Sequence, residues 1–271
     1  MTATPRRLTL ALAVLLAAGS VAAGTREDAR ADEAIRVLKQ IQAIPESSIP
    51  DRLLEDAHAI VVVPDTIKAG FMLGGRRGLG MMAVKRPDGS WSNPVFVKLS
   101  GASFGFQAGV QSADVILVFR SNRGLDNIVN GKFTLGADAS VAAGPVGRNA
   151  AAATDGAMKA EIWSWSRARG LFAGVALDGA VLQIDHGADR SVYGEGVTPR
   201  MIFEGRVRAP SAAIIAFRDT LEEATAAARY ARQRAEAASA PPPPAPGAAT
   251  VTPLGSDNPA SSAPLPPPTK P

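Results

Sequence analysis

The stretch with the clearest chemical potential is "GGRRGLG" at residues 74–80, which combines glycines with two adjacent cations, Arg76 and Arg77. Backbone N–H groups of glycine-rich loops and arginine guanidinium groups both bind phosphate. A Walker A loop has two glycines separated by four residues and then Lys and Ser or Thr, and no lysine lies between Lys68 and Lys85. The dinucleotide fingerprint does not fit either. The spacing therefore argues against a nucleotide site and leaves a turn or a site for another anion.

More basic residues lie around this stretch, and Asp88 is the one acid among them. If segments 71–76 and 79–86 pair as a hairpin, the two arginines lie at one end of it and further cations at the other. We expect an anion-binding surface, because each basic side chain near an anionic membrane gains about 1 kcal/mol. Scattered surface cations on a hairpin are the alternative. The residues assigned to this surface are Lys68, Arg76, Arg77, Lys85 and Arg86, with Lys98 nearby and with Phe71 and Trp91 as candidate interfacial side chains.

No catalytic constellation is visible. The two histidines are His58 and His186. His186 with Asp185 and Asp189 could bind a metal or act as a base, but small polar residues between strands are more typical of a turn. The absence of cysteine excludes disulfides, catalytic thiols and thiolate metal sites. We expect no enzyme, no metal and no cofactor, with a lipid-acting hydrolase at these three residues as the less favoured alternative.

The first residues predict export. Arg6 and Arg7 precede an apolar run from Leu8 to Ala18, and small residues follow up to Ala23. This pattern is typical of a signal peptide at 1–23, with a retained membrane anchor as the alternative. Without cysteine a lipoprotein anchor is impossible, so we expect a periplasmic protein or one peripheral to the envelope membrane. The net charge of +4 is too small to indicate nucleic-acid binding.

Helices are expected at both ends of the globular part. Residues 26–44 place apolar side chains at helical spacing, which predicts a helix packed on the domain; a membrane-surface helix is disfavoured because the polar face is more acidic than basic. A second helix is expected over 210–239, with Ser211 as its cap. Residues 240–271 are rich in proline and alanine and predict a disordered spacer or a ligand for a partner protein.

Short strand patterns fill the region between these helices. "AIVVVP" at 59–64 is typical of a buried strand, and Pro87-Asp88-Gly89 is typical of a hairpin turn. Glycine recurs within the strands, as at Gly101, Gly105 and Gly109, which indicates bends and bulges. These patterns predict an α+β fold, with a compact β-rich, barrel-like or strongly curved antiparallel sheet and flanking N- and C-terminal helices.

Six ordered motifs resemble a known family: "KAGFMLGGRRGLG", "PDGSWSNP", "GFQAG", "LGADASVAAGPVGR", "WSWSRARGLFAGVALDGA" and "YGEGVTP". In this order they resemble the SYLF-domain family of lipid-binding proteins, also called the Ysc84 actin-binding domain family, over about residues 51–209. The resemblance implies a compact β-rich domain that binds membrane phospholipids, notably phosphoinositides in eukaryotic members. Some of those members also bind actin filaments. The export signal makes actin an unexpected partner here and leaves anionic phospholipid or lipid A as ligands.

One motif departs from the family pattern. Trp163-Ser164-Trp165-Ser166 stands where the family has "SYS". Alternation along a strand places Trp163 and Trp165 on one face, where they pack as a pair or lie at a membrane interface. Arg148 sits at a motif end and is expected to join the cationic surface.

These observations predict non-enzymatic binding of anionic phospholipid head groups by an exported cell-envelope protein. The alternative is a structural or protein-interaction scaffold of the envelope, which recruits a partner through the Pro-rich tail.

Overall fold

The computed structural model describes residues 26–44, 48–145, 160–168, 171–175 and 177–239. The expected signal peptide at 1–23, the tail at 240–271 and Arg148 lie outside these residues. Within them, no helix is both long enough and apolar enough to cross a membrane.

The elements follow in an order that begins and ends with a helix. An N-terminal helix at 26–43 comes first. It is followed by α2 (Asp51–Glu55), β1 (Ala59–Val84), β2 (Val95–Phe119), α3 (Arg123–Asn130), β3 (Lys132–Thr134), β4 (Val141–Ala143), β5 (Ile162–Ala168), β6 (Leu171–Gly174), β7 (Val181–Ile184), α5 (His186–Tyr193), α6 (Pro199–Phe203) and α7 (Ala212–Ser239).

The strands form one strongly curled sheet. Its order is β3-β7-β2-β5-β4, with β1 paired to β2 and β6 paired to β5. The pairs are antiparallel except β4 with β5, which is parallel. The predicted α+β class with a curved sheet is confirmed, but the sheet is mixed and not wholly antiparallel, because β4 enters beside β5 in the same direction.

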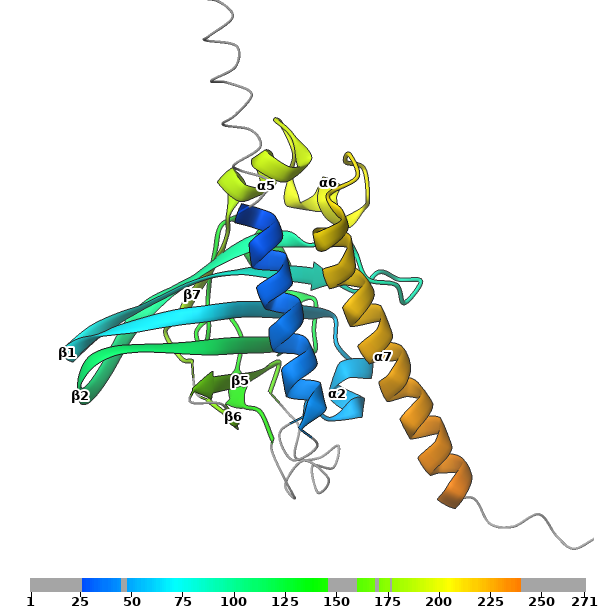
Figure 1. Ribbon diagram of the computed structural model, residues 1–271, viewed down its shortest axis with the longest axis horizontal. Coiled ribbons are helices and arrows are strands. Elements are labelled where there is room, and N and C mark those ends of the chain that lie inside the picture. The colour runs from blue at the N-terminus through cyan, green and yellow to red at the C-terminus, as the bar shows by residue number, and fades with distance from the viewer. Residues whose placement is uncertain (1–25, 45–47, 146–159, 169–170, 176, 240–271) are drawn as a thin grey trace, which may run out of the picture.

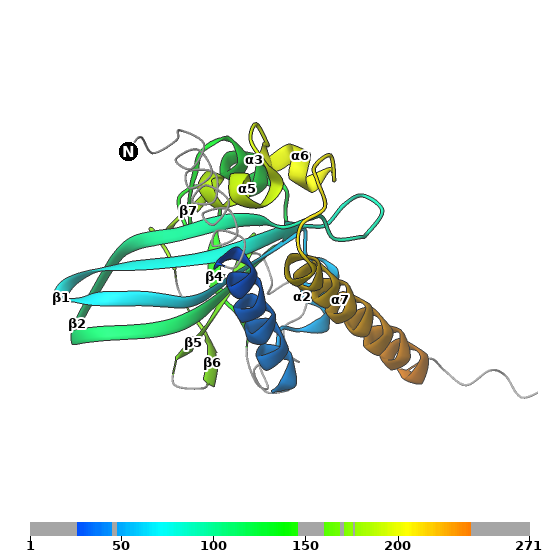
Figure 2. The same ribbon diagram turned by 45° about the horizontal axis from the view of Figure 1, so that its top comes forward.

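A long two-stranded ribbon of β1 and β2 dominates the sheet. The predicted turn joins the two strands, with Gly89 at a φ of 85° and the Arg86 N–H donating to the Ser90 carbonyl at 2.8 Å. The ribbon folds back on itself, and its tip projects away from the helices (Figures 1 and 2). The register shifts between residues 70 and 72 of β1, at a bulge near this tip, as the recurring glycines predicted.

The expected pairing of 71–76 with 79–86 is wrong. Both segments lie in β1 as far as its end at Val84, and each pairs with β2: Arg76 lies opposite Gly101 and Arg77 opposite Ser100. "GGRRGLG" is therefore extended strand and not a turn. The physical reason is that a two-stranded ribbon can bend by twisting and bulging, whereas a tight turn at this place would break the ladder with β2.

The helices cover the ribbon. Figure 1 shows the N-terminal helix (blue) crossing in front of the strands, with α7 (orange) beside it. The N-terminal helix buries Ala31, Ala34, Val37, Leu38 and Ile41, and α7 buries Ile214, Phe217 and Leu221, as helical spacing predicted. The Ser211 hydroxyl accepts from the Ile214 N–H at 3.4 Å, which confirms the expected cap. The two helices are joined where Ser211 hydrogen-bonds to Asp28.

Candidate functional site

The fold-back of β1 brings two parts of the same strand into direct contact. A Cβ built on Gly78 would lie 2.5 Å from both Thr66 Oγ1 and Val63 Cγ1. A Cβ on Gly80 would lie 2.2 Å from the Val62 carbonyl oxygen. Glycine is therefore needed at both positions for close backbone approach, and not for a left-handed turn. We call these two parts of β1 its limbs. A hollow between the two limbs begins at this contact.

We call this feature the β1 hollow. It has a volume of about 580 Å³ and is lined by one limb at Pro64, Asp65, Ile67 and Ala69, and by the other limb at 75–79. Strand alternation explains the exposed part of the lining, because the odd-numbered residues of both limbs are exposed. The even-numbered Pro64, Arg76 and Gly78 also line the hollow but are buried or half-buried.

Two large apolar side chains are exposed at the β1 hollow. Ile67 is 51% exposed on one limb and Leu79 is 37% exposed on the other. Among the described residues, one further large hydrophobic side chain, Tyr230 of α7, is exposed to a comparable degree. Exposed apolar side chains that gather around a concavity indicate a contact surface. Sequence reasoning missed Ile67 and Leu79, because both the odd- and the even-numbered residues of the preceding 59–64 run are buried and show no alternation to extend.

Arg76 and Arg77 lie at the same hollow. Arg77 is exposed, whereas Arg76 is half-buried and its Nε has no hydrogen-bond partner among the described residues. Burial lowers the pKa of the Arg76 guanidinium. An arginine nevertheless stays protonated at physiological pH, so the hollow contains a partly desolvated positive charge that no carboxylate satisfies through Nε.

Asp65 brings one negative charge to the hollow. Its φ is +45°, a left-handed conformation that is uncommon for residues other than glycine. The Asp65 N–H donates to Asp114 Oδ1 at 3.1 Å, and the Asp65 carboxylate accepts from the Ser112 hydroxyl at 3.2 Å. These contacts turn the carboxylate toward β2, so the one acid that lines the hollow already has a partner.

The other predicted cations do not join Arg76 and Arg77. Lys68 is half-buried on the first limb of β1 and does not line the hollow. Lys85 Nζ donates to the carbonyl oxygens of Leu54 at 3.2 Å and Glu55 at 2.6 Å, and it lies 5.2 Å from the Trp91 ring. Burial, and then the charge of Arg229, lowers the pKa of Lys85.

Arg86 and Lys98 also have structural partners. Arg86 Nε donates to the Phe203 carbonyl at 3.1 Å at the end of α6, and Lys98 Nζ forms a salt bridge with Asp185 at 2.9 Å. The prediction that Lys85 and Arg86 share one anion-binding surface with Arg76 and Arg77 is therefore wrong, because helix-end carbonyl groups hold both side chains. The nearby Lys98 is held by a buried carboxylate. Arg148 lies outside the described residues, so its assignment stays a prediction.

The three tryptophans are core residues. Trp91 is 1% exposed, Trp163 9% and Trp165 0%. Trp91 Nε1 donates to Thr225 Oγ1 at 3.0 Å, and Trp165 Nε1 donates to the Pro145 carbonyl at 3.4 Å. The expectation of interfacial tryptophans is corrected: these rings pack against helices and neighbouring strands instead of facing outward. The Phe71 side chain lies outside the described residues.

The suspected acid and base residues form a buried charge cluster. Asp185 caps α5 by accepting from the Ala188 N–H at 3.3 Å, so "DHGAD" begins a helix and is not the expected turn. Asp189 Oδ1 accepts from the Phe96 N–H at 2.9 Å. Arg30 Nη1 lies 3.5 Å from Asp185 Oδ2. His186 is exposed, and in the part of the chain that the structure describes no group of three metal-binding side chains is found.

Comparison with known proteins assigns the domain. A family model described as "Ysc84: Las17-binding protein actin regulator" matches residues 100–224, from β2 into α7. Residues 100–224 therefore carry a Ysc84 domain. The predicted family resemblance is thus confirmed, while the domain boundaries at 51–209 stay a prediction. The β1 hollow precedes the range matched by the Ysc84 model.

Two yeast proteins align over about three fifths of this chain. Protein YSC84 of Saccharomyces cerevisiae is 36% identical over 169 residues, which are 61% of this chain and 36% of the yeast protein. LAS seventeen-binding protein 3 of the same yeast is 34% identical over 173 residues, or 63% of this chain and 38% of that protein.

A bovine relative aligns over more of the chain. SH3 domain-containing YSC84-like protein 1 of Bos taurus is 28% identical over 239 residues, 86% of this chain and 70% of the bovine protein. The chain spans less than two fifths of the length of the two yeast proteins.

Proposed function

We propose that this chain binds anionic phospholipid head groups at the β1 hollow, without enzymatic chemistry. The observation that carries the proposal is Arg76, whose Nε is buried without a partner beside the exposed Ile67 and Leu79. A buried donor left unsatisfied is costly, and a bound phosphate oxygen would satisfy it.

The chemistry of the hollow matches a phosphate ester. A guanidinium group presents N–H donors in a planar fork, so a single arginine can donate to two oxygens of one phosphate. Arg76 is partly desolvated, which strengthens its attraction to an anion relative to a cation in bulk water. Arg77 is exposed and extends the positive charge toward solvent.

The apolar side chains distinguish a lipid from a soluble phosphate. Ile67 and Leu79 stand on opposite limbs of the hollow, next to the arginines. An interfacial contact combines apolar side chains at the acyl boundary with cations at the head groups. The ribbon tip that carries the hollow projects from the helical part of the molecule, which lets it approach a flat surface (Figure 2).

The proposal also includes the membrane on which the protein acts. The N-terminal sequence favours export, so the surface is an envelope membrane with anionic phospholipid or lipid A, and actin is not the expected partner. A second candidate is recognition of a protein ligand, as in an envelope scaffold. It is favoured by the relatives' names, one of which is LAS seventeen-binding protein 3.

Liposome flotation of the full chain tests the lipid proposal. We expect binding that rises with the fraction of anionic lipid and falls with salt. Changing Arg76 and Arg77 to Ala should weaken it by about tenfold or more, since each cation contributes about 1 kcal/mol near an anionic surface. Leu79→Ser should also weaken it, and by an amount that depends less on salt.

Arg200→Ala is the matched control, because Arg200 is an exposed arginine of α6 away from the hollow. It should leave flotation nearly unchanged. Equal binding to neutral and anionic vesicles, or undiminished binding by the double arginine variant, would contradict the proposal. Pull-down with and without residues 240–271 addresses the scaffold alternative, which requires that the tail matter for partner capture.

A further inference from the structure

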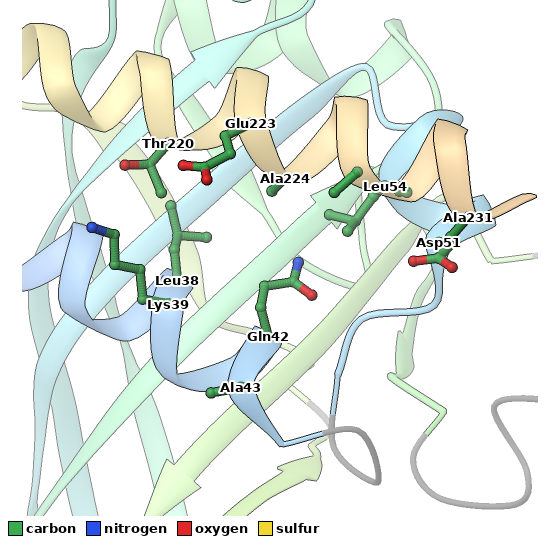
Figure 3. Close-up of a pocket in the computed structure, with 12 residues that line it drawn as sticks. Leu38, Lys39, Gln42, Ala43, Asp51, Leu54, Thr220, Glu223, Ala224 and Ala231 are labelled. Atoms are coloured by element: carbon green, nitrogen blue, oxygen red, sulfur yellow. The ribbon is translucent and has the colours of Figure 1, made fainter.

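A second hollow lies between two helices. It has a volume of about 590 Å³ and is lined by the N-terminal helix, α2 and α7 (Figure 3). We call it the helix groove and define it by Leu38, Gln42, Leu54, Ala224, Ala227 and Ala231. It is a different region from the β1 hollow, and none of its lining residues belongs to β1.

The α7 wall of the helix groove is made of small side chains. Ala224, Ala227 and Ala231 follow the spacing of one helical face, and all three are accessible along their length of the helix. Alanine lets a neighbouring helix approach to the short end of the usual interaxial range of about 8–10 Å. The same face continues beyond the groove to Arg234 and Ala238, where α7 extends past the rest of the molecule (Figure 1).

A polar group in the groove lacks a partner. Gln42 projects from the N-terminal helix toward α7 (Figure 3). Its Nε2 is buried and donates to no acceptor among the described residues. A buried amide donor is normally satisfied, so this atom points to a missing acceptor on an occupant of the groove.

The charges of α7 indicate what the occupant is. Asp219, Glu222 and Glu223 lie in the first half of the helix, and Arg229, Arg232 and Arg234 lie in the second half, with Arg218 and Glu236 as the exceptions. Glu223 is exposed at the rim of the groove, and Arg234 is also exposed. The two residues are about three helical turns apart on one face. Consider a second, identical α7 that runs antiparallel to the first and is centred on the midpoint between Glu223 and Arg234. Arg234 of the second helix would lie beside Glu223 of the first, and Glu223 of the second beside Arg234 of the first.

We infer that the helix groove holds α7 of a second copy of this chain, in a two-fold symmetric antiparallel pair. Such an interface is isologous: each α7 is both a wall of its own groove and the occupant of its partner's. The alanine face permits the close approach, and the opposite charges at its two ends set direction and register. The contact leaves both β1 hollows free, so it is independent of the proposed lipid binding.

Charge reversal tests the inference in the full chain. Sedimentation velocity at micromolar concentrations should show a dimer. Glu223→Arg and Arg234→Glu should each raise the dimer Kd by about tenfold or more, because each places like charges together twice in a symmetric pair. The variant with both changes should restore dimerisation, since it exchanges the charges without removing their complementarity. Glu195→Arg makes the same change of charge at a side chain that is 90% exposed elsewhere, and should have no effect.

Cross-linking gives a second readout. The chain has no cysteine, so Ala227→Cys introduces one thiol near the proposed two-fold axis. A short bismaleimide should link two copies of this variant and should not link copies of Ala212→Cys, at the exposed start of α7. A monomer at all concentrations, or a dimer that neither charge reversal weakens, would overturn the inference. Circular dichroism of each variant separates loss of assembly from loss of folding.

Discussion

Val62 and Gly80 belong to the same strand and lie against each other across its fold-back. A Cβ on Gly80 would come within 2.2 Å of the Val62 carbonyl oxygen and within 2.9 Å of Val63 Cα. Backbone atoms cannot move aside as the end of a flexible side chain can. The curl of β1, and with it the shape of the β1 hollow, therefore depends on the lack of a side chain at residue 80.

Gly80→Ala should lower the free energy of unfolding by about 1–3 kcal/mol or more, because overpacking forces backbone shifts. Urea titration of the full chain measures this. Gly75→Ala is the control within the same motif: its Cβ would meet the Gly101 carbonyl oxygen at 3.9 Å, an ordinary contact. We expect that change to stay within about 0.5 kcal/mol. Equal costs for the two substitutions would disprove the close-approach argument.

Asp189 should make stability depend on pH. Burial, and then the nearby Asp185 carboxylate, raises the pKa of Asp189 from 3.8 to about 7, against the opposing Phe96 N–H and Arg30. Because the folded pKa is the higher one, the stabilisation is complete below the unfolded pKa and is lost as pH rises toward 7. Asp189→Asn keeps an acceptor for the Phe96 N–H and should flatten this decline.

The measurement for Asp189 is the urea midpoint at several pH values between about 4 and 7. Asp219→Asn is the control, because Asp219 is an exposed α7 residue that pairs with Arg218. Asp185 does not contribute to the loss of stability as pH rises toward 7, because its pKa is lowered. Burial opposes its ionisation, but hydrogen bonds from Lys98 and the Ala188 N–H outweigh burial. A pH slope that persists in Asp189→Asn would assign the effect to another group.

Thr225→Val should destabilise the fold through Trp91. The Thr225 hydroxyl is buried and accepts from Trp91 Nε1, which would be left without a partner in the core. An unsatisfied buried donor costs about 1–3 kcal/mol. Thr220→Val removes an exposed hydroxyl of the same helix, so thermal unfolding should separate the two variants. Similar melting temperatures would show that the indole finds another acceptor.

Substitution of Lys85 should lower the stability of the fold, whereas substitution of Arg77 should weaken lipid binding. Lys85→Met removes the donor to the last carbonyl groups of α2 and should cost about 1–3 kcal/mol, with lipid flotation of the folded variant unchanged. Arg77→Ala should leave stability within about 0.5 kcal/mol and weaken flotation. The reverse pattern would place the lipid surface at the Lys85 end of β1.

Several features of this chain could be predicted from sequence because they depend on local spacing. The helical faces of 26–43 and α7, the Ser211 cap and the turn at Pro87–Gly89 each follow from residues a few positions apart. The curved β-rich sheet was predicted from glycines within strands, and the family from ordered motifs. Arg76 and Arg77 both line the β1 hollow, since they are adjacent in the chain, and their role in binding stays a prediction.

Only the tertiary structure decided which cations are available. Lys85 and Arg86 are near Arg77 in sequence, yet they bind the carbonyl ends of α2 and α6, which lie up to 117 residues away. Ile67 joined Leu79 at one hollow only because β1 folds back on itself. The physical reason is that local patterns fix which face a side chain occupies, whereas its partners depend on long-range packing that brings distant backbone groups to that face.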